Sequence, residues 1–199
     1  LWLAPTPVLI YALTHKRLES FIVAIIAFTL GSFAAELSLY WGTIYPIYAG
    51  IFGAFFNGVF FGIVVILTRR CAKRLPAWLS VFSFASLWCA YQFIWALMHN
   101  GNLTNTAVVS QMPALPLMQI LSITGIWGLC FLINAVGAGI AFAWHYRHHK
   151  RACTLALTLP IILLLATTSY GEYRLDHAPQ TPSITVGMAA RNPTSIKAF

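Results

Sequence analysis

Long apolar segments separated by short polar or basic stretches dominate this chain. A helix rises about 1.5 Å per residue, so about 20 apolar residues cross the roughly 30 Å hydrocarbon core of a bilayer. Leu1–Leu13 is apolar but short and contains two prolines, which favours a partial N-terminal span. Five further segments reach full length and predict transmembrane helices: Ser20–Trp41, Ile44–Thr68, Ala77–Met98, Gln119–Trp144 and Ala152–Tyr170. The predicted fold class is therefore an all-α polytopic membrane helical bundle.

The sequence changes character after Tyr170. Residues 171–182 contain two prolines and charges of both signs, which is typical of a linker. Residues 183–190 alternate between larger apolar and small or polar side chains, which predicts a β-strand, and Asn192-Pro193 follows as a turn signal. A lone strand is unstable in water, so we expect it to open a soluble domain that continues beyond the given residues. The predicted organisation is a transmembrane domain over 1–170, a linker over 171–182 and the start of a truncated domain over 183–199.

Composition excludes the common soluble classes. Of the 199 residues, 59% are hydrophobic and 8% are charged, whereas soluble domains carry about 25% charged residues. A soluble domain needs more polar surface than this chain supplies. The aromatic content of 15% also excludes disorder, because disordered chains are poor in aromatic residues. A polytopic membrane protein remains.

The positions of the charges predict an orientation. The formal net charge is +8, but most basic residues lie in three short loops, which are too small to form a nucleic-acid surface. Such loops face the cytoplasm under the positive-inside bias. The segment 99–118 and the tail after Tyr170 then lie on the opposite side. The clusters are Lys16 and Arg17; Arg69, Arg70, Lys73 and Arg74; and Arg147, Lys150 and Arg151.

Polar and small residues inside the spans are candidates for function or packing. Glu36 is the acidic residue within a predicted span; it is either an interfacial structural group or a group that lines a lipid or substrate cavity. Asn57, Gln92 and Asn134 lie near span centres and predict hydrogen bonds between helices. Small residues that recur every fourth position predict close helix packing at Gly50, Ala54, Gly58 and Gly62.

Trp127 departs from the pattern of the other tryptophans, most of which lie near span ends. It lies beside Gly125 and Gly128, about a third of the way along its span. The ring either fills the notch that these glycines leave or shapes a pocket, and the glycines themselves are candidates for helix packing. We identify no catalytic set of serine, histidine and acid, and no phosphate loop. We expect no cofactor and no metal site.

Residues 110–134 resemble a segment of a known protein family. Leu115-Pro116-Leu117-Met118-Gln119 follows a loop that ends in Gln111, and the pattern Ser-x-x-Gly-x-x-Gly-x-x-Phe-Leu begins at Ser122. This run resembles the apolipoprotein N-acyltransferases. Residues 4–9 and 186–193 resemble, more weakly, an early span end and the start of the nitrilase-like domain of that family.

The resemblance implies a multi-pass enzyme of the bacterial inner membrane with a periplasmic nitrilase-like α/β domain. Such an enzyme transfers an acyl chain from a phospholipid donor to the N-terminal amino group of a diacylglyceryl-cysteine lipoprotein acceptor, through a thioester on a cysteine assisted by glutamate and lysine. No residue here matches those three, so we expect this chain alone to be inactive. The candidates for a lipid or substrate cavity are Glu36, Gln111, Gln119 and Trp127.

Two other classes of function stay open. A membrane-anchored carbon–nitrogen hydrolase that cleaves small amides would share the nitrilase-like domain. A non-catalytic scaffold or transporter would be expected to carry paired charges along its spans or inverted repeats. Glu36 by itself gives that second class little support.

Overall fold

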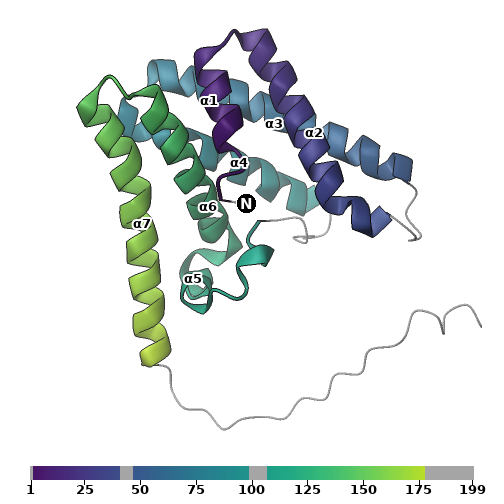
Figure 1. The fold of residues 1–199 in the computed structure, drawn as a ribbon. Helices are drawn as coiled ribbons and strands as arrows, with labels where there is room; N and C mark the ends of the chain where they lie inside the picture. Colours follow the sequence, from purple (N-terminus) through teal and green to yellow (C-terminus); the bar gives the residue numbers. More distant parts are fainter. Residues whose placement is uncertain (1, 41–46, 99–106, 178–199) are drawn as a thin grey trace, which may run out of the picture.

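The chain forms helices throughout the part that the structure describes (Figure 1). The structure, a computed structural model, describes residues 2–40, 47–98 and 107–177, and of residues 36–40 the backbone alone. No β-strand occurs within these ranges. The elements are α1 (Thr6–Thr14), α2 (Arg17–Tyr40), α3 (Ile47–Arg74), α4 (Ala77–Met98), η1 (Val109–Gln111), α5 (Leu115–Met118), α6 (Leu121–His145) and α7 (Lys150–Asp176).

Five of these helices are long and apolar enough to cross a membrane. They are α3, α4, α6, α7 and the part of α2 from Arg17 to Ala35. The prediction of an all-α bundle with five full spans is thereby confirmed. The strand predicted at 183–190 and the end of the predicted linker, residues 178–182, lie outside the described residues.

α3 and α7 each extend six residues past the C-terminal end of their predicted spans. α3 continues past Thr68 to Arg74, where Lys73 and Arg74 occupy the last turn; positive charges there interact favourably with the helix dipole. α7 continues past Tyr170 to Asp176, so residues 171–176 of the predicted linker are helical. Gly171 lies inside α7, where it packs closely against Pro116.

The predicted partial span at the N-terminus corresponds to α1. Its 9 residues reach about 14 Å, which is too short to cross a bilayer. Pro7 lies in the first turn, where a missing N–H costs no helix hydrogen bond. Leu9, Ala12 and Leu13 are buried, and α1 packs against α2, α3 and α6. The short helix α1 therefore packs inside the bundle against these three helices and does not span it.

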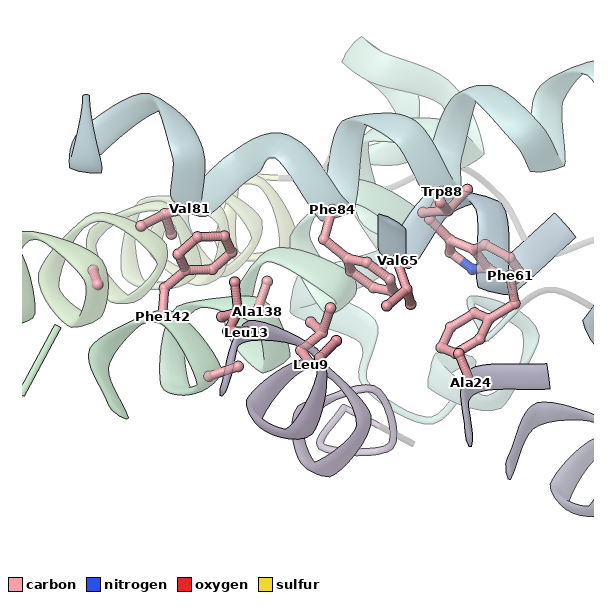
Figure 2. Packing of buried hydrophobic residues seen from close by; sticks show 14 of the residues in the cluster. Leu9, Leu13, Ala24, Phe61, Val65, Val81, Phe84, Trp88, Ala138 and Phe142 are labelled. Carbon is pink, nitrogen blue, oxygen red and sulfur yellow. The ribbon is translucent and has the colours of Figure 1, made fainter. Parts of the chain in front are cut away.

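The core runs through the middle of the bundle. Phe84 and Val81 of α4 are fully buried, as are Val65 of α3 and Phe142 of α6. Figure 2 shows Phe142 beside Val81, and Phe84 beside Val65. Lipid tails are as apolar as these side chains, so close van der Waals packing stabilises the bundle more than removal from water does.

Small residues let α2 approach α3 closely. A Cβ atom at Gly58 would lie 3.0 Å from the Ile25 carbonyl oxygen and would collide with the Thr29 hydroxyl, and one at Gly62 would lie 2.9 Å from the Phe21 ring. These contacts support the packing role predicted for the stripe along α3. All four members are buried: Gly50, Ala54, Gly58 and Gly62.

The three basic loops meet at one end of the bundle, toward the upper left of Figure 1. Arg69 on α3 reaches the connection between α1 and α2, where its Nη1 donates to the Ala12 carbonyl at 2.6 Å and also to that of His15. Tyr146, just after α6, shares a hydrogen bond of 3.1 Å with the Ser80 hydroxyl at the start of α4. The bundle therefore has one basic end, as the positions of the charges require.

Candidate functional site

A chamber of about 710 Å³ opens between the helices. This volume lies in the range of about 300–1,000 Å³ that is typical of ligand sites. Among the described residues, the wall contains no Lys, Arg, His, Asp or Glu side chain. Its lining comes from α1, α2, α3, α4, α6 and residues 107–110: Ala4, Pro5, Val8, Ala27, Phe28, Gly31, Ser32, Ala35, Asn57, Phe61, Phe84, Trp88, Tyr91, Gln92, Trp95, Ala107, Val109, Ser110, Ile133 and Asn134.

Aromatic rings form much of the wall. Phe28 stacks on Phe61 with ring centroids 4.8 Å apart and meets the edge of Trp88 at 5.4 Å. Tyr91 continues the cluster, 5.1 Å from Trp88. On α4 the aromatic residues recur at a spacing that keeps them on one helix face: Phe84, Trp88, Tyr91 and Trp95. This stripe was not predicted, although the spacing of the four residues by four, three and four positions is present in the sequence.

Polar side chains of the wall form two hydrogen bonds between helices. Tyr91 donates its hydroxyl to Asn57 Oδ1, which links α4 to α3. The Cys130 thiol donates to Gln92 Oε1 at 2.8 Å, which links α6 to α4. The predicted hydrogen bonds between helices are thus confirmed for Asn57 and Gln92. The prediction is wrong for Asn134, whose amide donates to the Cys130 carbonyl one turn earlier on its own helix, because a short amide in a helix reaches its own backbone readily.

The chamber lies away from the basic end. It begins at Ala4, just before α1, and on α2 it follows the second half of the helix from Ala27 to Ala35. Residues 107–110 close it on the side where α6 begins. The lining of α2 therefore starts about 15 Å along the helix from Arg17.

The Gln111 side chain forms two hydrogen bonds at the edge of the chamber. Its Oε1 accepts a hydrogen bond of 3.0 Å from Trp2 Nε1, and its Nε2 donates to the Ser110 hydroxyl at 2.8 Å. These bonds tie η1 to the start of the chain just before α1. Gln111 therefore lies beside the lining rather than in it, and positions Ser110, which does line the chamber.

The other predicted cavity residues lie outside the described lining. Gln119, at the junction of α5 and α6, donates to the Leu115 carbonyl at 3.4 Å. The Trp127 ring meets the Phe93 ring edge to face at 5.4 Å, so it packs α6 against α4. Glu36 belongs to α2, directly after Ala35 of the lining, but its side chain lies outside the described residues.

Two predicted packing glycines instead serve a break in α6. Gly125 has φ 63° and ψ −169°, a region that is open essentially to glycine alone, and a Cβ there would meet nothing within 4 Å. A close helix contact is therefore not what requires this glycine. A Cβ at Gly128 would collide with Thr124 on the other side of the break. Both glycines shape the backbone within their own helix.

The chamber can bind an apolar molecule, and its described lining offers no charged group for proton transfer. Its aromatic walls suit a hydrocarbon chain, and its hydroxyl and amide groups can orient an ester or amide by hydrogen bonds. Across the described ranges, no group of three or more His, Cys, Asp or Glu side chains is close enough to hold a metal ion.

Comparisons with known proteins point to one family. The model of the family "Apolipoprotein N-acyltransferase N-terminal domain" matches residues 1–139. An apolipoprotein N-acyltransferase of Geobacter metallireducens is 34% identical over 121 residues, which cover 59% of this chain and 23% of that protein. Apolipoprotein N-acyltransferase 2 of Treponema pallidum is 29% identical over 138 residues, which cover 67% and 24%. The matches thus span about a quarter of each relative, and no solved structure gives a significant match.

Proposed function

Because this chain belongs to the apolipoprotein N-acyltransferase family, whose N-terminal domain it matches, we propose that the protein transfers an acyl chain from a phospholipid to the N-terminal amino group of a diacylglyceryl-cysteine lipoprotein. The relatives are named for N-acyl transfer to apolipoproteins. Such a reaction brings together a lipid donor and a lipid-modified acceptor, so the protein must hold hydrocarbon chains next to the reacting groups.

The observation that carries this proposal is the chamber among the membrane-spanning helices, whose described lining is rich in aromatic side chains and holds no charged one. We assign to it one acyl chain of a lipid substrate. The rings of Phe28, Phe61 and Trp88 would contact methylene groups, and the Tyr91 and Gln92 side chains would lie near the ester. Binding energy from the chain far from the reacting bond then holds the ester in place for attack.

We propose that the basic end faces the cytoplasm of the inner membrane. The support is the positive-inside bias, because the three basic loops share one end of the bundle. The chamber then lies in the periplasmic half of the bilayer. α7 ends on that side as well.

The catalytic groups would come from the nitrilase-like domain of the family. In the proposed reaction a cysteine thiolate attacks the donor ester, the lysophospholipid alkoxide leaves with a proton, and the acceptor amine then displaces the thiol from the thioester. No residue of the given sequence was matched to that cysteine, glutamate or lysine. The chain described here would bind and orient the lipids.

We expect acyl transfer from the intact protein and none from residues 1–199 alone. Both would be incubated in phospholipid vesicles with a diacylglyceryl-modified lipopeptide, and mass spectrometry would follow the gain of one acyl chain on its N-terminal amine. Hydrolysis of a small amide by the intact protein, without any acylated lipopeptide, would instead support the membrane-anchored amidase. Acylation by residues 1–199 would contradict the assignment of catalysis to a later domain.

Labelling of single cysteines tests the orientation. In a background that lacks the native cysteines, Met112→Cys should react with a membrane-impermeant maleimide after outer-membrane permeabilisation alone, because Met112 is 61% exposed at the chamber end. Arg151→Cys should react only after the inner membrane is also opened. The opposite pattern would invert the proposed topology and place the chamber in the cytoplasmic half.

A further inference from the structure

A second hollow lies on the outer surface between α2 and α3, at the basic end of the bundle. Its volume is about 390 Å³. Both walls are apolar over most of their length, and among the described residues Arg17 is the charged member of the lining. The groove comprises Arg17, Leu18 and Phe21 of α2 with Ile63, Ile66 and Leu67 of α3.

The groove is built into the contact between the two helices. A Cβ at Gly62 would lie 2.9 Å from the Phe21 ring, so this ring lies directly over the glycine and forms the floor. The side chains of Leu18 and Ile63 are 70% and 42% exposed. Since α2 and α3 are membrane-spanning helices, these exposed walls face lipid, and an acyl chain is the molecule that surrounds them.

The mouth of the groove is cationic. Arg17 is the first residue of α2 and is exposed, and among the described residues it makes no hydrogen bond or ion pair. Arg70 follows Ile63, Ile66 and Leu67 at positions i+7, i+4 and i+3 on α3, so it continues the same helix face by about one turn. This contrasts with Arg69, whose guanidinium is bonded to the α1–α2 connection.

Two further features make this end suitable for an anion. The free N–H groups at the start of α2 carry partial positive charge, which attracts phosphate. The nearest acid in the sequence, Glu19, lies two residues after Arg17 and therefore about 200° around the helix. It does not share the face that holds Arg17 and Phe21.

We propose that this groove binds one anionic phospholipid, with the phosphate between Arg17 and Arg70 and one acyl chain along Phe21, Ile63 and Leu67. Basic pockets between transmembrane helices on the cytoplasmic side are sites for anionic head groups. The site lies at the opposite end of the bundle from the chamber. It depends on the membrane location of the chain and is independent of acyl transfer.

The test compares lipid binding to matched variants of the intact protein. Native mass spectrometry from a neutral detergent would measure retained dioleoyl phosphatidylglycerol and dioleoyl phosphatidylcholine. The double variant Arg17→Gln with Arg70→Gln should lose about 25-fold in affinity for phosphatidylglycerol, since each basic residue at a membrane surface contributes a factor of about five. Lys150→Gln with Arg151→Gln removes the same charge from the start of α7, which lies across the bundle from α2 (Figure 1), and should change that affinity less than about threefold.

A third variant tests the groove without changing its charge. Leu67→Trp would fill the hollow and should also release phosphatidylglycerol, while thermal unfolding in detergent shows that each variant remains folded. The proposal is overturned if both charge variants lose the lipid equally, if phosphatidylcholine is retained as well as phosphatidylglycerol, or if Leu67→Trp retains it. It is also overturned if glycerol 3-phosphate displaces the lipid at equal concentration, because the head group alone would then account for binding.

Discussion

Replacing Gly31 with leucine should lower acyl transfer by the intact protein by about 10- to 200-fold, because methylene groups in the wrong place in an apolar pocket carry penalties of that size. Gly31 lies on α2 in the wall of the chamber, and a Cβ there would meet nothing within 4 Å. The leucine would therefore occupy the space assigned to the acyl chain without disturbing a packed neighbour. Initial rates of lipopeptide acylation at several phospholipid concentrations would measure the effect.

Gly53→Leu is the matched control for this prediction. Gly53 lies within a transmembrane helix, α3, and a Cβ there also meets nothing within 4 Å, but the residue does not line the chamber. Both leucines raise helix propensity by a similar amount relative to glycine. If Gly31→Leu and the unaltered protein acylate the lipopeptide at equal rates, the chamber does not bind the acyl chain. If both variants lose activity equally, the leucines disturb the bundle in general.

Gly171→Ala should destabilise the protein by about 1–3 kcal/mol through overpacking. A Cβ at this position of α7 would lie 2.7 Å from Pro116 Cα and would collide with the Pro116 carbonyl group. These are backbone atoms and cannot rotate away, so α5 and α7 would have to separate. The thermal unfolding midpoint in detergent is the measurement, and we expect it to fall.

The direction of the change in stability distinguishes a closely packed glycine from an unpacked one. In an unpacked helix, glycine to alanine stabilises by about 1 kcal/mol, because alanine loses less conformational entropy. Gly53→Ala should therefore raise the unfolding midpoint or leave it unchanged, since nothing lies within 4 Å of its Cβ. A higher midpoint for Gly171→Ala as well would mean that α7 does not approach Pro116 this closely.

The spans and the basic end could be predicted from the sequence because the first depend on the length of an apolar run and the second on where the basic residues lie along the chain. A run such as Ala77–Met98 is long and apolar whatever surrounds it, and the charges of Lys73 and Arg74 mark an interface without any tertiary information. The end of α7 could not be placed in the same way. The linker was predicted to begin at Gly171, whereas the close contact of Gly171 with Pro116 is tertiary and leaves no mark in the local sequence.

The chamber was harder to predict because these helices are apolar on all sides. In a soluble helix the polar face identifies the buried one, but in a membrane both lipid and core favour hydrocarbon. Asn57 and Gln92 were informative because an amide inside a span needs a partner. Trp127 was selected as a cavity candidate and Trp88 and Tyr91 were not, since an aromatic residue by itself does not indicate which side of its helix faces a cavity.

The distribution of charges along α7 determines how far its last turn lies from the hydrocarbon core. Its uncharged stretch between Arg151 and Glu172 holds the 20 residues 152–171, which span about 30 Å and match the hydrocarbon thickness. Residues 172–176 bring three charges, and burying them by tilting would be unfavourable. The last turn therefore lies about 7 Å beyond the hydrocarbon, within the layer of lipid head groups, where Glu172, Arg174 and Asp176 stay hydrated.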